Sequence, residues 1–220
     1  MDRDRFRLSG VAAVVIVWCS LLLGAHRAHL DLVGPRPLSD LARHASSFVL
    51  FDAGVAVAAV LFMVFHGYLR RRYPVGLSFS VVMLVGMTGQ LVAAVVPLGG
   101  AGRANEVHVW SALVLGASLP LLMWRFAAAQ RPGPWRRLCA LLVAAEVAAC
   151  AVGYALSVRH LAPLAEIVAG VWFHVWVFAT TFVGPDRRVS GGWRGLQGDG
   201  EAVPRVDGGD GPHEVAELVG

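Results

Sequence analysis

The segment PLSDLARHASSFVLFD, residues 37–52, organises the chain because a polar loop turns here into an apolar helix. It begins with proline and small polar residues, and it ends with Asp52 inside the apolar run. A carboxylate inside a membrane span costs a few kcal/mol, so it needs a partner, water or a position near the interface. This segment therefore marks both the start of a membrane helix and a candidate functional site.

The composition of the whole chain indicates a membrane protein. Of 220 residues, 56% are hydrophobic and only 15% are charged, and the mean hydropathy is +0.61. A soluble domain carries more charge than this. The net charge of +4 does not indicate nucleic-acid binding, because the basic residues fall in short clusters between apolar runs, and we expect no nucleic-acid partner.

Apolar windows of about the length that crosses a bilayer occur six times. They are residues 9–25, 47–65, 77–98, 106–124, 138–158 and 161–183. The sequence therefore predicts an all-α integral membrane fold, a bundle of six transmembrane helices. The first window follows three arginines and resembles a signal peptide, but five further windows lead us to expect a retained anchor.

The arginines predict the orientation of the helices. If six spans alternate, 14 of the 19 basic residues lie on the side of the two termini. The positive-inside rule then places residues 1–8 and the tail 184–220 in the cytoplasm, with the protein in the plasma membrane. The tail is rich in Gly, Asp, Glu and Pro and has too few apolar residues to pack, so we expect it to be disordered.

Polar residues recur in the outer third of the predicted spans, and the loop before the second span lies above them. We expect residues 38–45 to form a short interfacial helix capped by Ser39 or Asp40. The candidate ligand-binding residues are Asp40, Asp52, Gln90, His108 and Glu166. They predict an outward-facing polar cavity between the second, third, fourth and sixth spans; the alternative is that each group is merely interfacial.

Two further ionisable residues lie deeper, on the hairpin of the last two spans. Glu146 precedes the turn, and His174 follows it, by about 12 residues each, which puts both about 18 Å from the outer surface. Equal depth predicts a hydrogen bond or ion pair between Glu146 and His174 that holds the hairpin in register. The alternative is that Glu146 and His174 take part in a proton relay.

Metal and cofactor chemistry finds little support in the sequence. The histidines of this chain do not pair at equal depth as a haem site needs, and the three cysteines have no metal or disulfide spacing. A zinc hydrolase using His44, Asp52, His108 and Glu166 stays open as an alternative, without any HxxxH or HExxH spacing. We expect no cofactor and no bound metal.

The order of these features resembles a bacterial, actinobacterial integral-membrane family of unknown function that is allied to the six-helix DRAM and Frag-type proteins. The resemblance is carried by the PLSDLARHASSFVLFD segment, Pro97, His108, and Glu166 with Trp176, over residues 9–183. Leu38 and Leu41 depart from the family pattern. The resemblance implies no established reaction; eukaryotic relatives are discussed as modulators of membrane lipid organisation or autophagy.

The sequence thus predicts a protein that binds or senses a lipid headgroup or a small polar ligand, with membrane lipids as partners. The prediction leans away from an enzyme. A metal-dependent hydrolase of lipids and a proton-coupled transporter are the alternatives, and homo-oligomer formation stays open.

Overall fold

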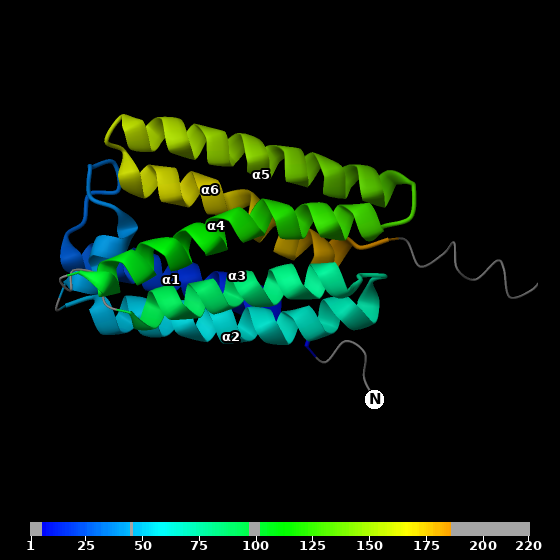
Figure 1. Ribbon diagram of the computed structural model, residues 1–220, viewed down its shortest axis with the longest axis horizontal. Helices are drawn as coiled ribbons and strands as arrows, with labels where there is room; N and C mark the ends of the chain where they lie inside the picture. The colour runs from blue at the N-terminus through cyan, green and yellow to red at the C-terminus, as the bar shows by residue number, and fades with distance from the viewer. Residues whose placement is uncertain (1–5, 45, 97–101, 186–220) are drawn as a thin grey trace, which may run out of the picture. The chain divides into compact units, whose positions relative to one another are not determined.

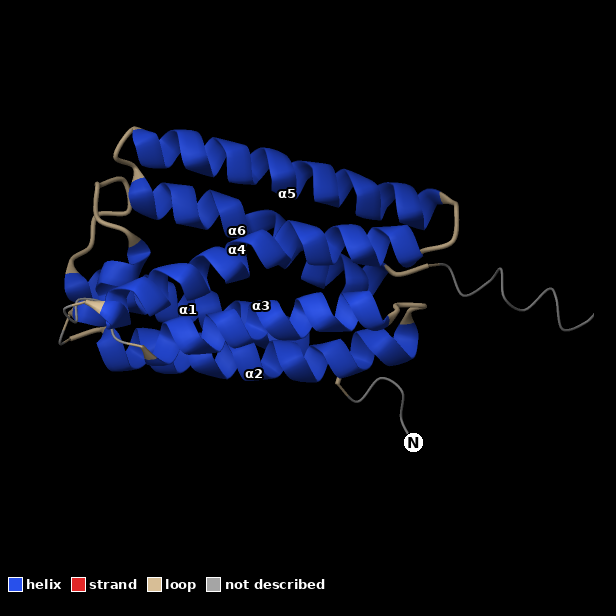
Figure 2. Ribbon diagram, viewed as in Figure 1, coloured by secondary structure: helices blue, strands red, loops and turns tan. Residues whose placement is uncertain are grey.

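The computed structural model describes residues 6–44, 46–96 and 102–185, and all regular structure within them is helical. The helices are α1 (Ser9–Ala28), η1 (Leu38–Arg43), α2 (Phe48–Arg72), α3 (Leu77–Val95), α4 (Arg103–Ala129), α5 (Pro134–Val158), α6 (Ala162–Phe178) and η2 (Ala179–Val183). Figure 2 shows these helices joined by short loops. Six of the helices, counting α6 with η2 as one, are long and apolar enough to span a membrane, which confirms the predicted six-helix fold.

The six long helices run up and down side by side, and each packs mainly on its neighbour in sequence (Figure 1). The α5–α6 hairpin lies on one side, α1, α2 and α3 lie on the other, and α4 joins the two groups. The first helix α1 and the last span α6 touch only sparsely. Helix α1 begins and η2 ends at the same end of the bundle, and the loop carrying η1 lies at the opposite end (Figure 1).

Helices α1, α2, α4 and α5 extend beyond the apolar windows that the sequence predicts, whereas α3 and the last span do not. Helix α2, for example, continues through Arg70–Arg72 to the residue before Tyr73. Arginine is a good helix former, and its charge is favourable at a helix C-terminus. The following Pro74 then disfavours helical backbone at Tyr73. The predicted disordered tail lies outside the described residues, except for Gly184 and Pro185.

Small residues bring the sequential helices into close contact. A Cβ atom at Gly54 of α2 would clash with the Ser20 hydroxyl of α1, and a Cβ at Gly86 of α3 would clash with the Ser118 hydroxyl of α4. Helices in lipid have no hydrophobic drive to associate, so close approach of this kind supplies much of their packing energy. These glycines therefore fix the α1–α2 and α3–α4 pairs.

Aromatic side chains pack together toward the end of the bundle where α2 ends and α5 begins. The ring of Tyr73 meets the ring of Phe126 edge-on at 4.8 Å, and Phe126 meets Trp176 at 5.2 Å. The Tyr73 hydroxyl donates a hydrogen bond to the backbone oxygen of Thr180 at 2.5 Å. Thr180 belongs to the π-helix η2, so Tyr73 ties the end of α2 to the end of the last span.

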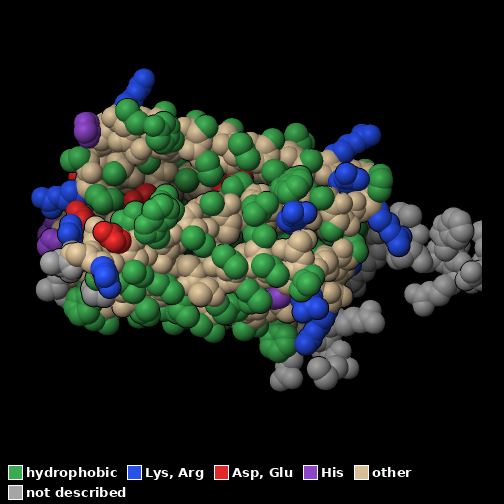
Figure 3. Space-filling model, viewed as in Figure 1, with side chains coloured by type: hydrophobic (Ala, Val, Ile, Leu, Met, Phe, Trp, Pro, Cys, Tyr) green, Lys and Arg blue, Asp and Glu red, His purple; other side chains and the backbone are tan. Residues whose placement is uncertain are grey.

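The surface between the two ends of the bundle is apolar. Hydrophobic side chains cover the middle of the face drawn in Figure 3, and arginines gather at both ends. Large apolar side chains remain exposed along the spans, among them Leu141 and Val152 on α5 and Val81 on α3. A bilayer covers such a surface, so the arrangement agrees with a multi-pass membrane protein.

Candidate functional site

The short helix η1 is anchored to the last span by one hydrogen bond. The backbone N–H of Leu38, its first residue, donates to Oε2 of Glu166 at 3.0 Å. Glu166 lies in the first turns of α6. No side-chain cap forms within η1 itself, so the predicted caps Ser39 and Asp40 are wrong. The reason is that η1 begins before these residues: Ser39 and Asp40 lie inside its first turn, and the cap position is Pro37, whose side chain has no acceptor.

Asp40 and Glu166 are brought together by this anchor. Their carboxyl groups are close enough to interact electrostatically. Asp40 also accepts a hydrogen bond from Nη1 of Arg43, and the two atoms are 3.4 Å apart. Like charges at short range repel, so a cation near both carboxylates is favourable here.

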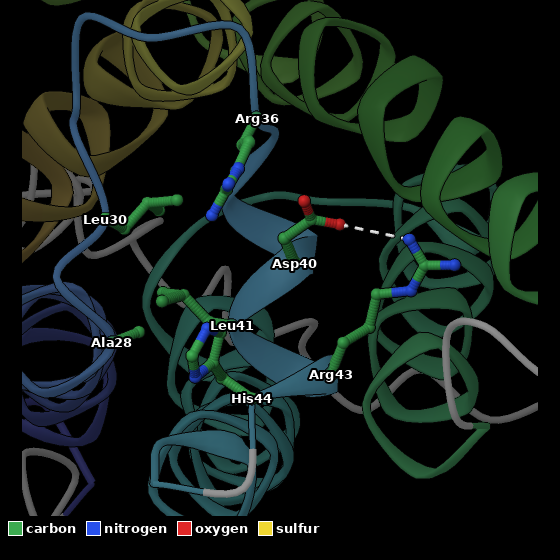
Figure 4. A pocket seen from close by; sticks show the side chains of 7 residues that line it. All are labelled: Ala28, Leu30, Arg36, Asp40, Leu41, Arg43 and His44. Carbon is green, nitrogen blue, oxygen red and sulfur yellow. Dashed lines mark hydrogen bonds and ion pairs between the residues drawn. The ribbon is translucent and has the colours of Figure 1, made fainter.

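A small pocket of about 80 Å³ lies beside η1, and we call it the η1 pocket. It is lined by Ala28, Leu30, Arg36, Asp40, Leu41, Arg43 and His44. Figure 4 shows Arg36 and Arg43 on opposite sides of Asp40, with the His44 ring beside Leu41. The pocket therefore combines an apolar floor with two guanidinium groups, a carboxylate and an imidazole.

Asp52 and His108 form a second group, between α2 and α4. They interact electrostatically, and Asp52 is half-buried. The buried His108 ring places Nδ1 3.2 Å from the backbone oxygen of Val96. A carbonyl oxygen can only accept a hydrogen bond. In the neutral ring, therefore, Nδ1 carries the proton and Nε2 does not. His108 thus holds the start of α4 to the end of α3.

Gln90 also contacts the backbone. Its Nε2 donates to the carbonyl oxygen of Val55 at 3.0 Å, and the side chain is buried. Gln90 thereby joins α3 to α2, as interhelical amides do in lipid. Of the five predicted ligand-binding residues, Asp40 is the one that lines the η1 pocket, and Glu166 lies next to Asp40.

Glu146 is fully buried between α5 and α6, with an exposed fraction of 0%. Neither of its carboxyl oxygens makes a hydrogen bond of good geometry among the described residues, although the backbone of Phe173 is near enough to interact with them. Nδ1 of His174 and Nε1 of Trp176 are also buried without a partner among these residues. The predicted hydrogen bond between Glu146 and His174 is therefore not formed. Glu146 lies against the backbone of Phe173, whereas the ring of His174 meets Trp18 of α1 edge-on at 5.8 Å.

The side chains that a zinc hydrolase would need do not converge. Within the described part of the chain, no group of three or more His, Cys, Asp or Glu side chains is placed to hold a metal ion. His44 lines the η1 pocket, while His108 is held by the Val96 carbonyl.

The site also contains Arg36, Arg43 and the backbone N–H of Leu38, which the sequence pattern did not indicate. Both arginines lie on the side that has few basic residues if the six spans alternate. Their nearness in sequence to Asp40 and His44 was the available signal.

Together, the fold and the η1 pocket define a multi-pass helical membrane protein with a charged pocket at one end of its bundle. Residues 8–183 match a family that is described as "Protein of unknown function (DUF998)". The chain belongs to the DUF998 family, whose function is unknown. No curated protein matches the chain, and no solved structure matches it.

Proposed function

We propose that the protein binds the phosphate-bearing headgroup of a membrane lipid in the η1 pocket. The observation that carries this proposal is a pair of guanidinium groups, from Arg36 and Arg43, that lie on opposite sides of Asp40 and line a small pocket together with apolar side chains. Guanidinium groups match phosphate oxygens in geometry and charge. The apolar floor suits the start of a lipid tail, whereas a freely soluble ligand would not need it.

The carboxylates next to the two arginines would fit a positively charged amine on the same headgroup. Asp40 and Glu166 interact electrostatically beside the arginines, so an amine on the headgroup would relieve their repulsion.

A phosphate that draws Arg43 away from Asp40 would also disturb η1, which is hydrogen-bonded to Glu166. Binding at η1 is thus coupled to the last span, which is how the protein would sense a lipid.

We expect the η1 pocket to face outward and the protein to have a role with lipids. The distribution of arginines favours an outward-facing η1 pocket in the plasma membrane, with both termini in the cytoplasm. The resemblance to DRAM and Frag-type proteins supports a role with lipids, because eukaryotic members are discussed as modulators of lipid organisation.

Native mass spectrometry of the full-length protein in nanodiscs tests the proposal. The nanodiscs contain phosphatidylethanolamine, phosphatidylglycerol and a phosphate-free glycolipid. We expect the wild type to retain a phospholipid after the nanodisc is stripped, and we expect the double variant Arg36→Gln/Arg43→Gln to lose it. Preference for phosphatidylethanolamine over phosphatidylglycerol, lost in Asp40→Asn, would support a role for the carboxylates.

Arg159→Gln is the matched control, because Arg159 lies in the exposed turn between α5 and α6 at the same end of the bundle. Equal lipid retention by the wild type and the double variant would refute the proposal, as would retention of the glycolipid alone. The masses also show whether the protein forms a homo-oligomer, which the sequence leaves open.

Proton-coupled transport is the second candidate, and the unpartnered carboxyl of Glu146 is the observation that favours it. A buried carboxyl group without a counter-charge is strongly driven to bind a proton. Flux driven by a pH gradient in liposomes, abolished by Glu146→Gln, would favour this function over headgroup binding.

A further inference from the structure

Two guanidinium groups lie where α1 begins, at the opposite end of the bundle from the η1 pocket. Cζ of Arg7, just before α1, lies 5.3 Å from the centroid of the Phe182 ring in η2. Cζ of Arg71, in the last turn of α2, lies 5.9 Å from the centroid of the Phe6 ring. Residues from α2, from η2 and from the segment before α1 thus meet here, and we call Arg7 and Arg71 the α1 arginine pair.

The α1 arginine pair has no counter-charge among the described residues. Neither side chain forms an ion pair or a hydrogen bond with them, and Nε of Arg7 is buried without a partner. The described acidic residues lie in the loop that carries η1, near the starts of α2, α4 and α6, or, for Glu146, inside α5. A guanidinium that loses water without gaining an anion is destabilised, so a bound anion is favourable here.

The α1 arginine pair lies at the level of lipid headgroups. Arg7 precedes the first candidate span, and Arg71 lies in the last turn of the second. The rings beside the two guanidinium groups are exposed, Phe6 by 39% and Phe182 by 54%, so a lipid can reach them. The anions at this depth of a bilayer are phospholipid phosphates, and their oxygens match a guanidinium in geometry and charge.

Apolar side chains continue from the α1 arginine pair toward the middle of the bundle. The ring of Phe182 stacks on that of Phe178, with 6.2 Å between their centroids. Phe178 in turn lines an apolar groove of about 360 Å³ between α1 and α6, together with Val14 and Val15 of α1. A phospholipid whose phosphate lies at Arg7 would therefore place its acyl chains against apolar surface, whereas free phosphate would gain nothing from that surface.

We infer that the α1 arginine pair binds the phosphate of an anionic phospholipid such as phosphatidylglycerol. The pair is positively charged and has no described carboxylate beside it, so a net negative headgroup binds more tightly than a zwitterionic one. Arg72 adds a third positive charge, because its Nη2 lies 3.6 Å from the Cβ position of Gly184, directly after η2. The η1 pocket, by contrast, is proposed to favour an amine. The two sites lie at opposite ends of the bundle, and neither depends on the other.

Native mass spectrometry of the full-length protein in detergent tests this site. The protein is titrated with phosphatidylglycerol or with phosphatidylethanolamine of the same acyl chains. The Arg36→Gln/Arg43→Gln background keeps the η1 pocket out of the measurement, so that the two proposals fail separately. We expect tighter binding of phosphatidylglycerol in this background, and we expect Arg7→Gln/Arg71→Gln to weaken it about tenfold or more.

Arg136→Gln/Arg137→Gln is the matched control. It makes the same change in charge with two exposed arginines in the first turn of α5, at the same end of the bundle. We expect the control to bind phosphatidylglycerol within about threefold of its background, because distant exposed charges are screened by salt. An equal loss of affinity in the control and in Arg7→Gln/Arg71→Gln would show only general attraction between charges, and would overturn the site.

Hydrogen exchange of the wild type gives a second readout that needs no variant. Phosphatidylglycerol should slow exchange of the amides of residues 7–12, and phosphatidylethanolamine should slow it less. Equal protection by inorganic phosphate at the same concentration would overturn the assignment to a lipid. Unchanged phosphatidylglycerol affinity in Arg7→Gln/Arg71→Gln would overturn the inference too, because an acidic side chain outside the described residues would then already neutralise the two arginines.

Discussion

Leu38 and Glu166 are 128 residues apart in sequence, and one hydrogen bond of 3.0 Å joins the backbone of the first to the carboxylate of the second. The bond places a loop that precedes the second span on the last span of the bundle. It also brings Asp40 next to Glu166 and so shapes the acidic side of the η1 pocket.

Removing the Glu166 carboxylate should loosen η1 without unfolding the bundle. Glu166→Ala leaves the N–H of Leu38 without its acceptor, which costs the loop about 1–3 kcal/mol. We expect faster hydrogen exchange of amides in residues 38–43 and unchanged exchange in α3. Glu166→Gln keeps a carbonyl oxygen as acceptor and should exchange at close to the wild-type rate. Equal exchange in all three proteins would show that the bond does not hold the loop.

Loss of the Tyr73 hydroxyl should destabilise the end of the last span. Tyr73→Phe removes the donor to the Thr180 oxygen, which lies in η2, at an expected cost of about 0.5–1.5 kcal/mol. Thermal unfolding in detergent measures this cost. Tyr154→Phe is the control, because Tyr154 is 75% exposed on α5. An unchanged unfolding temperature in Tyr73→Phe would contradict the assigned contribution.

Tyr73 should also make the folded protein less stable at alkaline pH. Burial raises the pKa of the Tyr73 hydroxyl above that of a free tyrosine. Above pH of about 10 the unfolded chain therefore loses a proton that the folded chain keeps, and the free energy of unfolding falls as pH rises. In Tyr73→Phe this fall should be shallower. Denaturant titrations between neutral and alkaline pH measure the slope, and parallel curves for both proteins would contradict the prediction.

Gly86 should tolerate no larger side chain. In Gly86→Ala the new methyl group meets the Ser118 hydroxyl, and overpacking costs about 1–3 kcal/mol. Gly116→Ala in α4 is the control, since nothing lies within 4 Å of its Cβ position. Unfolding by sodium dodecyl sulfate should separate the two variants, with Gly86→Ala the less stable. The double variant Gly86→Ala/Ser118→Ala should recover part of the loss.

Glu146 offers a test of whether its carboxyl group is paired in the membrane. Because both oxygens lack partners, replacement by the similarly sized Met should leave stability unchanged or raise it by about 1–3 kcal/mol. Thermal unfolding in nanodiscs is the measurement, and Glu106→Met at the exposed start of α4 is the comparison. Marked destabilisation by Glu146→Met would mean that the carboxyl group binds a partner, as the predicted pair with His174 requires.

Hydropathy was enough to predict the six helices, because a long apolar segment that crosses a bilayer satisfies its own backbone hydrogen bonds by forming a helix. It could not give the helix ends, since Arg70–Arg72 continue α2 although they leave the apolar window. Nor could it give the cap of η1, because local sequence contains Ser39 and Asp40 but not the spatial neighbour Glu166.

Depth along a helix follows from counting residues, but the direction of a side chain around the helix does not. Counting placed Glu146 and His174 at one level, and the rotation of α6 then turned His174 toward Trp18 and left Glu146 against Phe173. For the same reason, the polar character of Gln90 and His108 did not reveal that each is bonded to a backbone carbonyl.

The last span is tethered near its two ends and unsupported along one side between them. Glu166 fastens its outer end to η1, and Tyr73 fastens η2 to the end of α2. Between these two tethers, α6 meets α1 only sparsely. Between its two tethers the last span is therefore held mainly by α5, so the spacing of α6 from α1 can change without breaking either tether.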